Sequence, residues 1–160
     1  MPNPVKAIPD GYHTVTPALT VRDGAKAVEF YKRAFGAREA FRMDGPNGKL
    51  MHAELKIGDS SIMLGEENLQ WGAQSPEFLK GTPVSLYLYV PNVDAAFAQA
   101  VAAGAKALKP VDDMFWGDRQ GEVSDPFGHR WSLATHKEDL TPEQISQRAQ
   151  EFFAGLSKRK

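Results

Sequence analysis

The chain repeats its own pattern with an offset of 69 residues, and this repeat limits the folds that are open to it. Matched pairs include Leu19 with Leu88, Val21 with Val90, Ile62 with Trp131 and Leu64 with Leu133. Asp23 and Asn92 also match, and both are residue types that cap the start of a helix. A repeat of this kind indicates one supersecondary unit that is present twice and packs against its copy.

Each copy has the pattern of a strand, a helix and three further strands. The first copy predicts a strand over 13–21, a helix over 24–35, and strands over 39–43, 50–57 and 61–64. The second predicts a strand over 85–90, a helix over 95–103, a strand over 107–111, a loop over 112–121, and strands over 121–124 and 130–134. Pro17 has no amide hydrogen, so an edge or a bulge is expected there.

These patterns predict an α+β fold. Two tandem β-α-β-β-β modules, residues 13–68 and 84–136, are expected to form a cupped mixed sheet, because each sheet has one face covered by its helix and one bare face. A further helix is expected over 141–157, outside the repeat. Thr141 suits its N-cap, Pro142 its first position, and Gln144 completes a capping box.

Composition excludes several classes of function. Nineteen Lys and Arg oppose twenty Asp and Glu, so there is no basic surplus for nucleic-acid binding. The sequence contains no apolar run of about 18 residues, so no membrane span is predicted. The first residues lack the apolar stretch of a secretion signal. With no cysteine, disulfides and thiolate metal sites are excluded. A cytoplasmic location is the default expectation.

Several local motifs resemble those of the vicinal-oxygen-chelate superfamily, which includes glyoxalase I, bleomycin-resistance proteins and extradiol dioxygenases. The likeness is strongest to its PhnB-like branch. The matching segments are residues 19–23 (LTVRD), 27–31 (AVEFY) with 35–37 (FGA), 52–55 (HAEL), and 125–129 (DPFGH) with Trp131. The resemblance implies paired β-α-β-β-β modules, a cupped sheet and a homodimer.

The resemblance also implies where a metal ion would bind. Metal-dependent members hold a divalent ion with His, Glu or Gln from the first and last strands of each module. The corresponding positions here are Thr16, Met63, Ser85 and Ser132. Hydroxyls and a thioether are poor ligands for Zn, Ni or Fe. We therefore expect no metal ion and no other cofactor.

Two histidines need separate interpretations. His52 and Glu54 are two residues apart on a predicted strand, so their side chains point the same way. They could act as a base and its orienting carboxylate, or as metal ligands. The alternative is a partly exposed structural pair. His129 follows Gly128 in a turn, and there we expect it to brace the backbone.

Aromatic and polar residues of the second copy suggest a ligand site. Tyr87 and Tyr89 share a strand face with Ser85, and Trp116 lies in the predicted loop. With the hydroxyls of Thr16 and Ser132, they would suit a planar or amphipathic organic ligand. The same aromatics could instead fill a dimer interface or the core. Arg119 and Arg130 could meet an anionic group, or form surface ion pairs.

The sequence thus predicts a small-molecule binding protein without a metal ion. Its partners would be the ligand and a second copy of the chain, with the ligand held in the sheet cup at a dimer groove. Two alternatives stay open at this point. One is a metal-dependent lyase or dioxygenase-like enzyme, and the other is a metal-free enzyme that uses His52 and Glu54.

Overall fold

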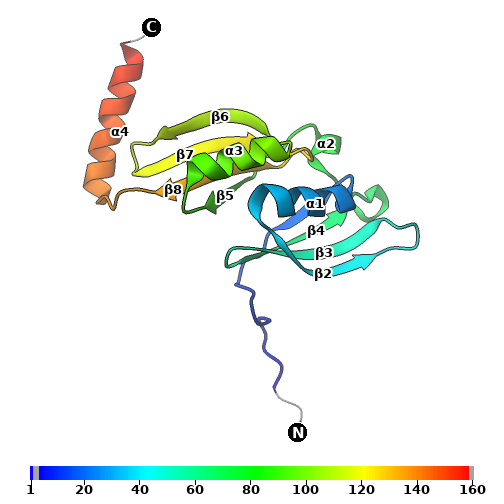
Figure 1. Cartoon of the computed structure of the whole chain (residues 1–160). Helices are drawn as coiled ribbons and strands as arrows, with labels where there is room; N and C mark the ends of the chain where they lie inside the picture. Colours follow the sequence, from blue (N-terminus) through cyan, green and yellow to red (C-terminus); the bar gives the residue numbers. More distant parts are fainter. Residues whose placement is uncertain (2–3, 159–160) are drawn as a thin grey trace.

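The computed structural model describes residues 1 and 4–158, and it consists of two modules with the same order of elements (Figure 1). The first module contains β1 (Ala18–Val21), α1 (Gly24–Phe35), β2 (Arg38–Asp44), β3 (Leu50–Ile57) and β4 (Ser60–Glu66). The second contains β5 (Ser85–Tyr89), α3 (Val93–Ala103), β6 (Lys106–Asp113), β7 (Asp118–Ser124) and β8 (Arg130–His136). Between them lie the short helices η1 (Leu69–Trp71) and α2 (Pro76–Leu79), and α4 (Pro142–Ser157) ends the fold.

Both modules form a four-stranded mixed sheet with the same topology. The strand orders are β1-β4-β3-β2 and β5-β8-β7-β6, and in each sheet the first pair is parallel and the others antiparallel. Ala18 lies opposite Met63 in the first sheet, and Tyr87 lies opposite Ser132 in the second. Each residue of the second pair lies 69 positions after its counterpart in the first pair. The prediction of an α+β fold with two β-α-β-β-β copies is therefore confirmed.

Each helix covers one face of its own sheet, because alternate strand residues point toward it. Leu133 and Val123 of the second sheet are buried in the core, and Leu86 packs against it. The face that points away from the helix is called the open face below. On β5 it carries Ser85, Tyr87 and Tyr89, and all three are exposed.

The two modules contact each other through α1, α3 and the turn between β7 and β8 (Figure 1). The Tyr31 hydroxyl of α1 donates to Oδ2 of Asp125 at 2.6 Å, and Trp131 Nε1 donates to the same oxygen at 2.9 Å. Gln99 Nε2 of α3 donates to the carbonyl of Arg33 at 2.7 Å. The modules are therefore joined on their helix side, and this packing leaves the exposed side chains of β5 uncovered.

The turn at residues 125–129 holds this junction together. Asp125 Oδ1 accepts from the backbone amides of Phe127 and His129, at 2.9 and 3.0 Å. His129 Nε2 donates to the carbonyl of Thr20 at 2.9 Å. The imidazole thus braces β1 of the other module rather than its own turn.

Some element boundaries differ from the sequence-based expectation. β1 begins at Ala18 rather than at residue 13, because Pro17 cannot donate to the ladder and Val15 is 82% exposed. The loop expected over 112–121 is shorter, since β7 begins at Asp118, which lies opposite His136. Trp71 of the connector is 71% exposed and does not pack on the core.

Helix α4 extends away from the second sheet, at the opposite end of the molecule from the N-terminus (Figure 1). The expected capping box is present, with Thr141 and Gln144 each bonded to the other's backbone amide. Phe115 contacts Phe152 of the helix at a ring-centroid distance of 5.5 Å, but no helix residue is buried. Among the described residues, every helix lacks the length or the apolar character needed to cross a bilayer.

Candidate functional site

Most of the predicted site residues lie on the open faces of the two sheets. Those on the second sheet are Ser85, Tyr87, Tyr89, Arg130 and Ser132, and those on the first are His52 and Glu54. The strand period of two residues explains this grouping. The exceptions are Arg119, which points to the helix side of β7, Trp116, which lies between β6 and β7, and Thr16, which precedes β1.

A buried carboxylate organises the tyrosine pair. Asp118 is only 4% exposed, and its Oδ2 accepts from the hydroxyls of Tyr87 and Tyr89, each at 3.0 Å. Its Oδ1 accepts from His136 Nδ1 at 2.9 Å, and His136 Nε2 lies 2.8 Å from Oδ1 of Asp139. The two tyrosine rings remain 44% and 61% exposed, with centroids 5.1 Å apart. We refer to these five residues as the Asp118 cluster.

The hydrogen bonds of this cluster shift the ionisation of its members. Burial opposes the charge on Asp118, but hydrogen bonds from its neighbours, His136 foremost, outweigh burial and lower its pKa. Burial raises the pKa of Tyr87 to about 12; a hydrogen bond from Trp116 opposes this shift, and the bond to Asp118 supports it. Hydrogen bonds to Asp139 and Asp118 raise the pKa of His136. These shifts stabilise the carboxylate form of Asp118, the neutral forms of Tyr87 and Tyr89, and the protonated form of His136.

The four positions that would hold a metal ion do not fit one. Ser85 Oγ and Ser132 Oγ lie 3.2 Å apart and hydrogen bond to each other. Met63 offers a thioether and Thr16 a neutral hydroxyl, so no carboxylate or imidazole is in the set. Within residues 1 and 4–158, no group of three or more His, Asp or Glu is arranged as metal ligands.

The open face of the first sheet carries a second polar chain. His52 Nε2 lies 3.2 Å from Glu54 Oε1, and the Tyr12 hydroxyl donates to Glu54 Oε2. Lys56 and Ser61 both donate to the carbonyl of Gly11, so the N-terminal segment lies against this face. The bond from Tyr12 is the largest cause of the lowered pKa of Glu54, followed by His52, while burial opposes it.

Both predicted arginines are engaged in ion pairs. Arg119 contacts both carboxylate oxygens of Asp94 on α3 at 2.9 Å, and Asp113 at 3.1 Å. It therefore joins β7 to α3 on the side away from the open face. Arg130 pairs with Glu122, which also accepts from Lys109 at 2.9 Å. The side chain of Glu122 is almost completely buried by these partners.

A groove of about 700 Å³ lies between the modules, next to the tyrosine pair. Its lining includes Phe35 at the end of α1, Asp59 in the β3–β4 turn, Gln99 of α3, and both Tyr87 and Tyr89. Thr16 instead lines a smaller neighbouring cavity of about 150 Å³. A volume of several hundred Å³ with a mainly apolar lining is typical of small-molecule sites.

Sequence reasoning did not identify several residues of these faces. Asp118 falls within the loop expected over 112–121, whereas it is the first residue of β7. Tyr12 precedes the first predicted strand, and nothing in its local pattern indicates a contact 42 residues away. Glu54 lies opposite Met63, and Glu122 lies opposite Ser132. The two glutamates therefore occupy equivalent positions in the two modules, and a closer comparison of the repeats could have identified this equivalence.

Comparison with known proteins gives consistent results. A family model described as Glyoxalase/Bleomycin resistance protein/Dioxygenase superfamily matches residues 12–133. The uncharacterized protein Rv0887c of Mycobacterium tuberculosis is 44% identical over 134 residues, which are 82% of this chain and 79% of the relative.

Several solved structures have a fold similar to that of this chain. TioX from Micromonospora sp. ML1 matches with a TM-score of 0.63 and 29% identity, over 78% of this chain and 98% of TioX. The fosfomycin resistance protein FosX from Listeria monocytogenes, complexed with Mn(II) and sulfate, matches with a TM-score of 0.62. It is 19% identical, over 86% of this chain and 97% of FosX, so it shows the fold alone. The chain belongs to the glyoxalase/bleomycin resistance protein/dioxygenase superfamily.

Proposed function

We propose that the protein binds a small organic molecule on the open face of its second sheet, without a metal ion. The observation that carries this proposal is the tyrosine pair: Tyr87 and Tyr89 are exposed, yet Asp118 fixes both hydroxyls at 3.0 Å. A fixed and exposed aromatic pair is ready to contact a planar ligand without a large loss of side-chain entropy. The adjacent groove of about 700 Å³ supplies the room.

We propose further that a second copy of the chain completes the groove. Large apolar side chains are exposed on the first module and on the C-terminal helix, among them Phe41 and Met43 of β2, and Phe152 and Phe153 of α4. Such surfaces are more often covered by a partner than left in water. Sedimentation equilibrium should therefore give twice the chain mass. A monomer at micromolar concentration would overturn the dimer and leave the ligand face to be tested alone.

A thermal-shift panel of small aromatic compounds tests the binding proposal. A ligand that binds only the folded state at about 100 times its Kd stabilises that state by about 2.7 kcal/mol, and so raises Tm. Tyr89→Leu should abolish the shift while lowering the unliganded Tm only modestly, because the ring is exposed and Asp118 keeps its bonds from Tyr87 and His136. Trp71→Leu, which alters an exposed aromatic of the connector, is the matched control. Failure of every compound to raise Tm would refute the proposal.

A second candidate function has its own support. The chain of contacts from Tyr12 through Glu54 to His52 resembles an oriented base, so a metal-free proton transfer on the first sheet is the alternative. His52→Ala should then remove turnover and leave ligand binding intact. A metal-dependent lyase or dioxygenase is not proposed, because the donor set does not suit a metal ion. Within the superfamily we place the chain in the PhnB-like branch, on its sequence motifs.

A further inference from the structure

The Asp118 cluster turns its polar hydrogens inward. Both tyrosine hydroxyls donate to Oδ2 of Asp118, and Tyr87 has a second protein acceptor, Gln120 Oε1, at 3.3 Å. The Nδ1 hydrogen of His136 is committed to Asp118, and Nε2 is paired with Asp139. A ligand approaching this surface therefore meets mainly oxygen lone pairs and ring faces, with the Gln120 amide as an N–H donor at its edge.

The charges of the cluster have the same consequence. The cluster contains two carboxylates, Asp118 and Asp139, and His136 can offset only one of them, so the local formal charge is negative. The exposed faces of Tyr87 and Tyr89 add the negative potential of their π-systems. An anion would meet few donors here, whereas a cation or an N–H group would meet several acceptors.

The nearby basic residues do not reverse this balance. Arg119 is paired with Asp94 and Asp113 on the helix side of β7. Arg130 and Lys109 are both paired with Glu122 on the open face. Their donors point at protein carboxylates, and Arg130 and Lys109 share the single charge of Glu122, which lies four residues from Asp118 along β7, roughly 13 Å away.

We propose that the Asp118 cluster binds a planar aromatic cation, such as a ring that bears a protonated amine or an amidinium group. The ring would stack on the tyrosine pair, and its N–H groups would donate to the phenol oxygens and to Asp139. This assignment of ligand class rests on the proposed function, which places the ligand on this face.

Three tricyclic probes of similar size test the ligand class by fluorescence titration at about pH 8 and low salt. They are 9-aminoacridine, which is a cation, acridine, which is neutral, and anthracene-9-carboxylate, which is an anion. We expect the cation to bind about tenfold more tightly than the neutral probe, in line with a partly desolvated cation–π contact. The anion should bind most weakly.

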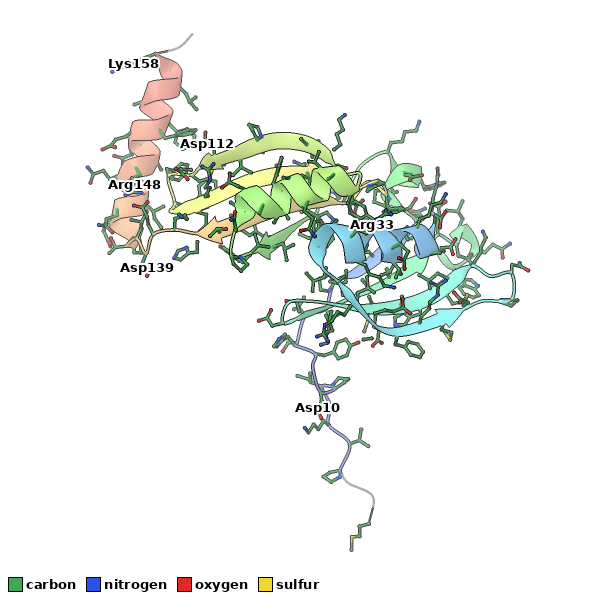
Figure 2. All side chains as sticks on the ribbon, viewed as in Figure 1. Asp10, Arg33, Asp112, Asp139, Arg148 and Lys158 are labelled. Carbon is green, nitrogen blue, oxygen red and sulfur yellow. The ribbon has the colours of Figure 1, made fainter. Side chains whose placement is uncertain are left out.

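Three variants locate the effect. Asp118→Asn should remove the preference for the cation, and Tyr89→Leu should weaken binding of all three probes. Asp112→Asn is the control, because Asp112 and Asp139 both lie at the end of the second sheet near α4 (Figure 2), but Asp112 is outside the cluster. If Asp118→Asn does not fold, as checked by circular dichroism, the exposed Asp139→Asn replaces it and should reduce the preference.

The outcomes separate the two proposals. Equal affinity for the three probes, or tightest binding of the anion, would overturn the cation assignment while leaving a small-molecule site in place. An unchanged preference in both acidic variants would also overturn it. If no probe binds and the wider panel raises no Tm, the proposed function fails as well.

Discussion

Replacing Tyr31 by Phe tests whether the buried junction joins the two modules. The Tyr31 side chain is fully buried, and its hydroxyl lies 2.6 Å from Asp125. The substitution removes one oxygen and leaves Asp125 with its three other donors. A hydrogen bond to a charged group contributes about 1.5–3 kcal/mol, so we expect the free energy of unfolding to fall by about 2 kcal/mol.

Urea denaturation followed by tryptophan fluorescence and far-UV circular dichroism measures this loss. With a urea m-value of about 2 kcal/mol/M, the midpoint should fall by about 1 M while m stays the same. A double-mutant cycle with Asp125→Asn should give a coupling energy above about 1 kcal/mol, because the two groups are in contact. Coupling near zero, or an unchanged midpoint, would refute the reasoning.

The same variant gives a distinctive pH dependence. Burial and the nearby Asp125 charge raise the pKa of Tyr31 well above its usual value. Above about pH 10 the unfolded chain loses the phenol proton while the folded chain keeps it, so the stability that the hydroxyl contributes declines as pH rises. Above about pH 10, the difference in free energy of unfolding between the natural protein and Tyr31→Phe should narrow by up to about 1.4 kcal/mol per pH unit. A gap that stays constant up to about pH 11 would contradict a buried hydroxyl.

Three further predictions concern the open faces. Tyr12→Phe should raise the pKa of Glu54, because the hydrogen bond from Tyr12 is the largest cause of the lowered pKa. Carboxyl NMR titration measures this pKa, and an unchanged value would show that the contact is absent. The pKa of His136 is raised in the folded state. The free energy of unfolding that His136 contributes is therefore complete below about pH 6.5, the pKa of an unfolded histidine, and it is lost as pH rises through the higher pKa of the folded state. Melting curves of His136→Gln and the natural protein should converge over this range; a gap independent of pH would count against the ion pairs. Finally, Zn(II), Ni(II) and Mn(II) should leave Tm unchanged, and a saturable rise would show that our assessment of the donor set is wrong.

The order of elements could be predicted from the sequence because it depends on local patterns. Strand alternation and the capping residues Asp23, Asn92 and Thr141 all act within a few residues, and the structure contains each of these caps. Because the second module repeats the first, the order of elements expected in one module also predicts the order in the other. The PhnB-like assignment, the homodimer and the site residues stay predictions.

The contacts between elements could not be predicted in the same way. Nothing in the pattern around Tyr31 shows that its hydroxyl meets Asp125, which is 94 residues away. The Asp118 cluster was missed because a polar stretch with Gly117 was interpreted as a loop, although cross-strand pairing makes Asp118 part of β7. The bare sheet faces were expected to form a cup, but the sequence does not show that the modules of one chain meet through their helices.

This helix-side contact makes the halves of the chain interdependent. Phe30 of α1 lies 6.1 Å from Phe127, and Phe35 lies 4.6 Å from Trp131, measured between ring centroids. A fragment that ended in the connector would expose one side of this aromatic contact to water. Although the chain contains two copies of one unit, we therefore expect each copy to need the other, and expression of either alone should yield an insoluble product unless the complementary fragment is supplied.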